Sequence, residues 1–283
     1  MSTRNTSDNH AVSAAETASN TATGDTRQPI LLSNLSDDGA LTLTLNRPKQ
    51  FNALSNEMLD ALQSALDKLP DEVRVIVIAG AGKAFCAGHD LQEMRANIDE
   101  QWQEDLFSKC SRFMQSLVNL PVPVIARVQG IAAAAGCQLV ANCDLAIAAD
   151  HCTFGVSGVN LGLFCSTPSV ALSRNISRKR AFQMLVTGEF IDAETATQWG
   201  LINEAVPESD LDDAIGKLCS NICGKSRVAV STGKSLFYQQ IEIPLDKAYS
   251  LAGSTMACNM MAEDVSEGID AFFGKREPRW KDQ

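Results

Sequence analysis

The sequence lacks any long uninterrupted apolar run. Its longest apolar stretches are broken by Asp or Gln, whereas a helix needs about 18 to 20 consecutive apolar residues to cross a bilayer. We therefore predict a soluble chain with no membrane partner.

Positive charge is also scarce. The 24 Lys and Arg residues are outnumbered by 34 Asp and Glu residues, which gives a formal net charge of -10. Nucleic acids and anionic membranes attract clustered Lys and Arg and repel an acidic surface. The charge balance therefore argues against a nucleic-acid partner.

Cysteines are present without a pairing pattern. The nine cysteines are an odd number and are scattered through mostly apolar segments, which is typical of a reduced intracellular chain. Cys219 and Cys223 are one helical turn apart, but they have no second pair and no nearby His. We therefore predict no zinc site and no other metal.

Large apolar residues are almost absent from residues 1–28, which are rich in Ser, Thr, Asn and Ala. Such a segment cannot bury enough surface to offset its ordering entropy, so we predict a disordered tail. Arg4 and Arg27 are accompanied by three acidic residues, whereas a mitochondrial presequence is Arg-rich and poor in acids. A secretory apolar core is missing as well, and we expect a cytoplasmic location.

Strand and helix patterns alternate from residue 30 onward. Two strands at 30–33 and 40–45 flank an Asp-Asp-Gly turn and predict a hairpin. Ser55 precedes an amphipathic helix that runs to about residue 69. The β-branched run at 73–79 then predicts a strand buried on both faces of a sheet.

The same order repeats, with a helix at about 100–118, a strand at 122–128, a helix at 135–142 and a strand at 144–149. This order predicts an α/β fold with right-handed crossovers. After Phe154 helical patterns dominate, at about 167–175, 178–187, 192–199, 210–223, 227–239, 243–259 and 263–273. A length of 283 residues fits one main domain with a smaller appendage.

The first segment that could carry chemistry is 83–91, Lys-Ala-Phe-Cys-Ala-Gly-His-Asp-Leu. It follows the strand at 73–79 and opens a helix at Asp90. NH groups at a helix amino terminus have no intrahelical partner and can bind an anion or a developing oxyanion. For this segment taken alone, an ordinary strand-to-helix turn capped by Asp90 is the favoured interpretation.

The second segment, 128–139, has the same strand, turn and helix order. Residues 132–136 are all Ala or Gly, so a ligand can approach the backbone closely. Two such turns on successive βα units can converge on one oxygen atom.

Several motifs together resemble the crotonase superfamily of enoyl-coenzyme A hydratases and isomerases. They are Asn46-Arg-Pro-Lys-Gln-Phe-Asn-Ala-Leu-Ser55, Ala84-Phe-Cys-Ala-Gly-His-Asp90, Pro123-Val-Ile-Ala126, Gly136-Cys-Gln-Leu139, Cys143-Asp144, Leu185-Val-Thr-Gly188 and 193–206. Segments 132–141 and 158–168 resemble the enoyl-coenzyme A hydratase domain-containing protein 3 group of this superfamily.

The resemblance implies a spiral core of ββα units at 29–205 and a helical trimerisation region at 206–283. It implies a homotrimer or a dimer of trimers (a hexamer). The ligand would be an acyl-coenzyme A thioester, with no separate cofactor because coenzyme A is part of the substrate. Its carbonyl oxygen would lie between the backbone NH groups of His89 and Ala135. The resemblance places Ala87, Gly88, Asp90, Leu91, Gly136, Gly158, Cys165 and Lys275 at the substrate.

Both glutamates of the family's hydratases are missing. Gln138 stands at the first position and Gly158 at the second. An amide exchanges no proton at neutral pH and glycine has no side chain, so hydration by two glutamates is excluded.

Decarboxylation of a malonyl-type thioester needs no general base, because loss of carbon dioxide generates the enolate. The segments 87–90 and 159–162 resemble methylmalonyl-coenzyme A decarboxylase of the same superfamily, although Cys165 replaces its tyrosine. Three hypotheses therefore stay open: an acyl-coenzyme A enzyme of the hydratase/isomerase family, a decarboxylase, and a non-catalytic acyl-coenzyme A-binding protein.

Roles for four side chains also stay open. His89 either transfers a proton or lines the wall, and Gln138 either orients the thioester or is structural. Cys165 either lines the acyl pocket or packs as a small apolar residue. We expect Asp144 to position the backbone rather than to react.

Overall fold

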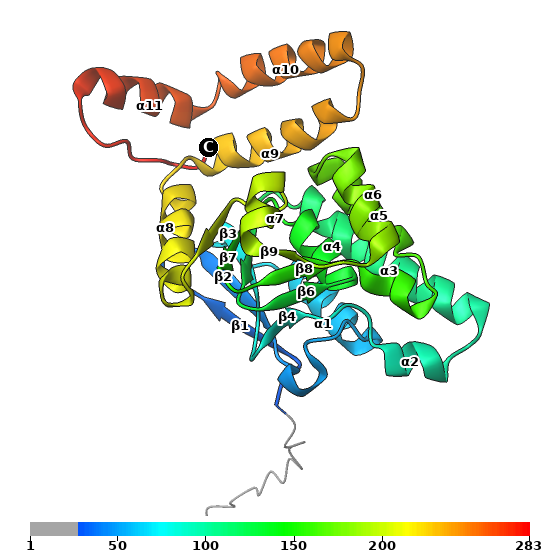
Figure 1. The fold of residues 1–283 in the computed structure, drawn as a ribbon. Coiled ribbons are helices and arrows are strands. Elements are labelled where there is room, and N and C mark those ends of the chain that lie inside the picture. Colours follow the sequence, from blue (N-terminus) through cyan, green and yellow to red (C-terminus); the bar gives the residue numbers. More distant parts are fainter. Residues whose placement is uncertain (1–27) are drawn as a thin grey trace, which may run out of the picture.

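The structure is a computed structural model that describes residues 28–283. The disordered tail predicted at 1–28 lies outside the described residues except for Gln28. Figure 1 shows sheets and helices packed into one body, with the last three helices extending beyond it.

One sheet has six strands in the order β1-β2-β3-β5-β7-β10. The predicted hairpin is present, because β1 and β2 are antiparallel, whereas the other neighbours are parallel. Every residue of β3 is buried, which explains its continuous apolar run. The strands are β1 (Leu31–Leu35), β2 (Ala40–Leu45), β3 (Val75–Gly80), β5 (Val124–Val128), β7 (Leu145–Ala149) and β10 (Glu204–Val206).

A second sheet has four short strands in the order β4-β6-β8-β9. They are β4 (Ala84–Cys86), β6 (Ile131–Ala133), β8 (Thr153–Gly155) and β9 (Ile191–Asp192). Successive segments of the chain add one strand to each sheet and then a helix, which produces a spiral of ββα units. The α/β fold class is confirmed, but these short strands were not predicted because two or three residues show no periodicity.

Helices pack around the two sheets. Ser55 caps the first of them, with its side chain accepting a hydrogen bond from the NH of Met58 at 3.2 Å. These helices are α1 (Asn56–Asp67), α2 (Leu91–Ala96), α3 (Glu100–Asn119), α4 (Ala135–Asn142), α5 (Ser166–Asn175), α6 (Arg178–Thr187) and α7 (Ala193–Trp199), with 3-10 turns η1 (Pro48–Gln50), η2 (Ser157–Leu161) and η3 (Glu208–Asp210).

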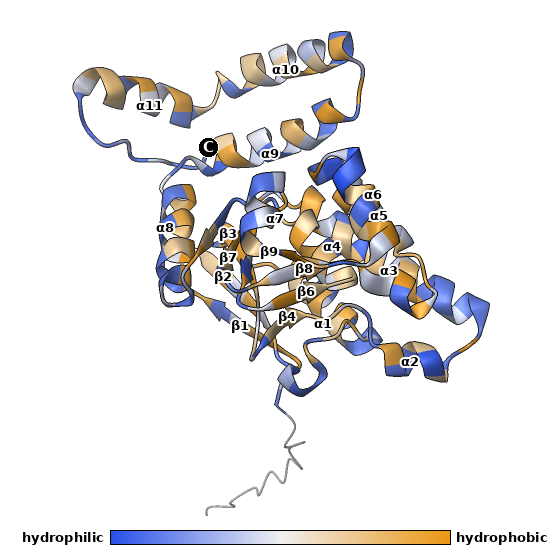
Figure 2. Cartoon of the chain, in the orientation of Figure 1, coloured by the Kyte–Doolittle hydropathy of each residue, from blue (hydrophilic) through white to orange (hydrophobic). Residues whose placement is uncertain are grey.

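The carboxyl-terminal helices are α8 (Leu211–Cys223), α9 (Arg227–Ile241), α10 (Leu245–Asn259) and α11 (Glu263–Gly274). Figure 1 shows α10 and α11 on the far side of α9 from the sheets. Figure 2 shows hydrophobic segments along these outer helices. Large apolar side chains are accordingly exposed there, including Leu245, Tyr249, Met256, Phe272 and Phe273.

A buried polar cluster joins α9 to the core. Lys234 Nζ donates hydrogen bonds to Leu117 O at 2.7 Å, Val122 O at 2.9 Å and Asp144 Oδ2 at 2.7 Å. Tyr238 donates to Asp144 Oδ1 at 2.7 Å. Asp144 also accepts from the NH of Val124 at 2.6 Å, so its carboxylate positions the backbone, as the sequence led us to expect.

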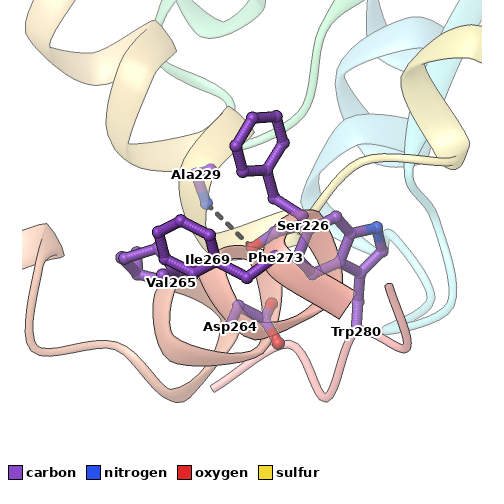
Figure 3. A pocket seen from close by; sticks show the side chains of 9 residues that line it. Ser226, Ala229, Asp264, Val265, Ile269, Phe273 and Trp280 are labelled. Atoms are coloured by element: carbon purple, nitrogen blue, oxygen red, sulfur yellow. Dashed lines mark hydrogen bonds between the residues drawn. The ribbon is translucent and has the colours of Figure 1, made fainter. Parts of the chain in front are cut away.

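The chain end folds back against the start of α9. Trp280 Nε1 donates to Gly224 O at 2.8 Å, and Arg74 Nη1 pairs with Asp282 Oδ2 at 3.2 Å. Figure 3 shows the pocket that this arrangement leaves, lined by side chains of α9, α11 and Trp280. The lining is almost wholly apolar, with the Ser226 side chain accepting from the NH of Ala229 at 3.3 Å.

Residues 28–283 contain neither a membrane-spanning helix nor a metal-binding cluster. No helix in this range is long and apolar enough to cross a membrane. No group of three or more His, Cys, Asp or Glu side chains in the same range could hold a metal ion, and Cys219 and Cys223 lie on one helix, α8.

Candidate active site

The two small-residue turns predicted from the sequence lie against each other. A Cβ atom built on Gly88 would lie 2.9 Å from the Cβ of Ala134 and 3.2 Å from the backbone N of Ala135. No side chain can occupy that space, so the backbone after β4 reaches the amino terminus of α4. The structure thus brings together the segments that carry His89 and Ala135.

The first turn is held by the chain before α1. Gly88 has φ +97°, a conformation that favours glycine, and its carbonyl accepts a hydrogen bond from the NH of Leu54 at 2.8 Å. Asp90 then caps α2 by accepting from the NH groups of Gln92 and Glu93 at 2.9 and 3.2 Å. Asp90 is thereby occupied as a helix cap.

Ala134 shapes the second turn. Its φ of 48° is unusual for a residue with a side chain, and its NH donates to Gly155 O at 2.8 Å. Gly136 lies so close to the carbonyl of Cys86 that no side chain fits there. This close packing aligns α4 with β4 and directs the first NH groups of α4 toward the first turn.

The NH groups of His89 and Ala135 are without a protein acceptor within the described part of the chain. Ala135 is the first residue of α4, where backbone NH groups lack an intrahelical acceptor. The partial positive charge of a helix amino terminus adds to the attraction for an anionic oxygen.

The His89 imidazole is turned into the protein. Its ring contacts Phe107 edge-on, with 5.4 Å between ring centroids, and Nδ1 lies 3.4 Å from Leu54 O. Nε2 is buried and has no hydrogen-bond partner among the described residues. Burial lowers the pKa of His89 below its usual value, although Leu54 O and Glu93 oppose the shift. The ring is therefore neutral at neutral pH.

Gln138, which the family resemblance places at the first glutamate position, is almost completely buried, with 4% of its surface exposed. Its Oε1 atom finds no hydrogen-bond donor in the structure of residues 28–283. A buried amide oxygen without a donor is costly in protein interiors. This side chain is therefore available to a ligand.

Gly158, which the family resemblance places at the second glutamate position, has no space for a side chain. A Cβ atom there would lie 2.5 Å from Leu163 O and 2.7 Å from Cys165 Sγ. Cys165 is buried, and burial raises its thiol pKa. The side chain nearest to Gly158 Cα is therefore a neutral thiol.

Of the other residues predicted at the substrate, some lie beside the first turn and one lies far from it. Ala87 and Leu91 flank the first turn, and the NH of Ala87 donates to Phe51 O at 3.0 Å. Lys275 follows α11, which Figure 1 shows on the far side of α9 from α2 and α4. Within one chain the structure does not bring Lys275 to the other site residues.

Two residues that support the candidate site were not predicted from the sequence. Asn52 is fully buried with φ 54°, and its amide donates to Ala81 O and Ala84 O at 2.9 and 2.8 Å. It thereby holds the chain leading to β4. Phe107 packs on His89 from α3. Asn tolerates the left-handed conformation, and its place in the first matched motif was the available signal.

A cleft of 1420 Å³ adjoins the site and is lined by Gln138 together with residues of α3, α5 and α9. The apolar pocket of Figure 3 has a volume of 490 Å³ and lies at the other end of α9. Neither volume is lined by His89 or Ala135.

A spiral of ββα units with a helical carboxyl-terminal region defines a protein of the crotonase type. The chain belongs to the enoyl-CoA hydratase/isomerase family, because the model of that family matches residues 36–283. It is therefore a member of a family of acyl-coenzyme A enzymes.

Relatives in sequence support this assignment. The enoyl-CoA hydratase domain-containing protein 3 of Rattus norvegicus is 42% identical over 259 residues, which cover 91% of this chain and 86% of the relative. The Homo sapiens protein of that name is 45% identical over 245 residues, which cover 86% and 81%. The predicted resemblance to this group is confirmed.

Solved structures agree with the fold. The crystal structure of an enoyl-CoA hydratase of Mycobacterium smegmatis is 55% identical, with a TM-score of 0.88, and the match covers 89% of this chain and 99% of that chain. The human enoyl-coenzyme A hydratase domain-containing protein 3 has a TM-score of 0.85 at 42% identity, covering 89% and 100%.

The predicted cytoplasmic location is contradicted. The relatives from rat, human and mouse are all named as mitochondrial proteins. The prediction depended on two Arg and three acidic residues in a short segment. So few charges do not distinguish a mitochondrial presequence from a cytoplasmic tail. The same segment also has the Ser-rich composition that transit peptides share.

Proposed function

We propose that this chain binds an acyl-coenzyme A thioester with its carbonyl oxygen between the NH groups of His89 and Ala135, and stabilises the thioester enolate there. The contact between the two turns carries the proposal. Two NH donors aimed at one oxygen stabilise negative charge without reorganisation. The nearby carboxylate of Asp90 is engaged by the NH groups of Gln92 and Glu93 instead.

The proton-transfer chemistry differs from two-glutamate hydration. Gln138 offers an amide, Gly158 has no room for a side chain, and Cys165 has a raised pKa. Neither position supplies a base at neutral pH. Any reaction here must therefore form its enolate with little help from these positions.

Decarboxylation of a malonyl- or methylmalonyl-type thioester is favoured by this observation. The bond between Cα and the carboxylate breaks, its electron pair forms the enolate, and carbon dioxide leaves. The enolate carbon then takes a proton from water. Only the oxyanion contact is required of the protein in the first step.

Turnover of a panel of thioesters tests the proposal. Crotonyl-, 2,4-dienoyl-, malonyl- and methylmalonyl-coenzyme A would be incubated with the protein and analysed by mass spectrometry. We expect at least one to be consumed, with carbon dioxide release if decarboxylation is the reaction. Binding without turnover would favour the non-catalytic hypothesis, and absence of binding would refute all three hypotheses.

Gly88→Ala tests the oxyanion contact directly. The new methyl group would be forced against Ala134, and φ +97° is unfavourable for Ala, so the two NH groups should separate. We expect turnover to fall by roughly 10²-fold or more, as for loss of one oxyanion donor. Gly216→Ala, on α8 with nothing within 4 Å, is the matched control.

We also infer that the active form is a homotrimer or a dimer of trimers. The exposed apolar side chains of α10 and α11 support this, since Tyr249, Phe272 and Phe273 are each more than 70% exposed in the single chain. A neighbouring subunit would cover them and could bring its own Lys275 toward coenzyme A.

A further inference from the structure

The buried amide of Gln138 lacks a hydrogen-bond donor. The residue is 4% exposed, and its Oε1 atom has no donor among the residues that the structure describes. The buried amide of Asn52 is different, because it accepts from the NH of Arg47 at 2.9 Å and donates to two backbone carbonyls. An unpaired buried acceptor is unfavourable for folding, so the stability of the fold does not account for Gln138.

The geometry of α4 directs this amide toward the proposed oxyanion site. Side chains on a helix lean toward its amino terminus and cover the turn before their own Cα atom. For Gln138 that turn begins at Ala134, whose carbonyl accepts a hydrogen bond from the Gln138 NH at 3.0 Å. Ala134 and Ala135 present only methyl groups, so the longer amide extends over them. It therefore lies at the first turn of α4, near the Ala135 NH.

The distance between Ala135 and Gln138 matches one bridging water molecule. The two residues are separated by about 4.5 Å along the helix axis. A water that makes two contacts of about 2.8 Å spans roughly 5 Å between its partners. With a thioester carbonyl oxygen at the Ala135 NH, such a water can reach both Oε1 of Gln138 and the Cα atom of the enolate. One of its protons then points to Oε1 and the other to Cα.

The other polar side chains predicted at the site leave one alternative proton donor. Leu54 O can only accept a hydrogen bond, so the Nδ1 atom of His89 that faces it at 3.4 Å carries the ring proton. The Nε2 atom of the neutral ring consequently has no proton to give. Gly158 has no side chain, whereas the Cys165 thiol is neutral and makes a hydrogen bond with the Gly158 backbone. Water and this thiol are the two sources to be distinguished.

We propose that Gln138 is a positioning residue that holds the protonating water on one face of the thioester enolate. Its Oε1 atom accepts a hydrogen bond from this water. The second O–H bond of the water breaks, its proton forms the new Cα–H bond, and the hydroxide passes to solvent. The inference rests on the proposed function, which supplies the enolate by loss of carbon dioxide. It adds that protonation occurs from the α4 side only, so that the product has one configuration at Cα.

Decarboxylation of methylmalonyl-coenzyme A in D₂O reveals the face of protonation. The two faces of the enolate differ at Cα, and addition of one deuteron gives propionyl-coenzyme A with an R or an S configuration. After hydrolysis, ²H NMR of the ester with a chiral alcohol would give the ratio of the two products. We expect one enantiomer in roughly tenfold excess, the discrimination that one hydrogen bond can provide.

Two substitutions at position 138 separate the oxygen acceptor from the bulk of the side chain. Gln138→Leu keeps a similar volume but removes the acceptor, so the deuteron should arrive from both faces and the enantiomer ratio should approach one. Gln138→Glu keeps an oxygen at the same place and should retain the excess. Gln183→Leu, at an exposed position of α6, is the matched control and should leave the ratio unchanged.

The stability of the Gln138→Leu protein tests whether the amide is structural. Replacing a buried unpaired amide with an apolar side chain of similar size removes a desolvation cost. We expect the urea midpoint of Gln138→Leu to equal or exceed that of the wild-type protein. A clearly lower midpoint would show that the amide stabilises the fold, and would overturn the positioning role.

The outcomes distinguish this inference from the proposed function. If methylmalonyl-coenzyme A is decarboxylated and the wild-type product is racemic, the positioning role is overturned although the proposed function stands. The same conclusion follows if Gln138→Leu retains the excess, or if Cys165→Ala alone abolishes it, because the thiol would then be the proton donor. If neither malonyl- nor methylmalonyl-coenzyme A releases carbon dioxide, decarboxylation and this inference are both overturned.

Discussion

At position 158 the backbone leaves no room for a side chain. The space beside its Cα atom is filled by Leu163 O and by Cys165 Sγ, at 2.5 and 2.7 Å from a Cβ. The family resemblance predicts that a carboxylate is missing at this position. The structure shows that the surrounding chain leaves no room for a side chain there.

Gly158→Ala should therefore destabilise the protein. Forcing a methyl group into a packed site costs about 1 to 3 kcal/mol, and the rigid carbonyl of Leu163 cannot move as a flexible side chain would. Urea denaturation followed by circular dichroism would measure the change. Gly216→Ala, in the open interior of α8, should instead be neutral or slightly stabilising. Equal stabilities for the two variants would contradict the packing argument.

His89 illustrates what a residue pattern leaves open. From the sequence, proton transfer and wall lining were equally plausible for its side chain. The imidazole contacts Phe107, and burial lowers its pKa, so the structure favours the wall role for the ring. The backbone NH, rather than the titratable group, is the part of His89 that the proposed chemistry uses.

At the scale of elements, α9 is the connection between the core and the carboxyl-terminal helices. Lys234 and Tyr238 are one turn apart on α9, and both reach Asp144. Burial lowers the pKa of Lys234, whereas Asp144 opposes that shift, and burial raises the pKa of Tyr238. These contacts fix the orientation of α9 relative to the core, beside the cleft.

Lys234→Met should loosen this attachment. Removing one partner of a buried ion pair leaves an uncompensated charge, here Asp144, and costs about 3 to 5 kcal/mol. Tyr238→Phe, which removes one hydrogen bond to a carboxylate, should cost about 1.5 to 3 kcal/mol. Both are measurable by chemical denaturation. Lys217→Met, at an exposed position of α8, is the control, and a loss as large as that of Lys234→Met would refute a specific role for the cluster.

The long elements were predictable and the short ones were not. The helix predicted at 100–118 is observed as Glu100–Asn119, and the helix at 135–142 coincides with α4. By contrast β4, β6 and β8 each have three residues. Their pairing depends on neighbours supplied by distant parts of the chain, such as β6 against both β4 and β8. This second sheet carries the turns that form the candidate site.

At the scale of the whole molecule, the exposed apolar surface of α10 and α11 has no explanation in a single chain. Large apolar side chains there are exposed in the single chain. Apolar patches of this kind are typical of subunit interfaces. The proposed trimer would remove them from water.

Size-exclusion chromatography with light scattering should find a trimer or a hexamer. Tyr249→Glu combined with Met256→Glu places two charges on α10, at side chains that are 74% and 71% exposed, and should shift the protein toward monomer. Ile98→Glu, which adds a charge at an 82% exposed side chain between α2 and α3, should leave the mass unchanged. A monomeric wild-type protein would contradict the assembly proposal.

The sequence by itself determined the family and the alternation of strands and helices, because these depend on local patterns and motifs. The tertiary structure decided which of those local features meet. Only folding brings Gly88 against Ala134 and places α9 opposite Gln138 across a cleft. Such contacts join residues far apart in the chain, and no local periodicity encodes them.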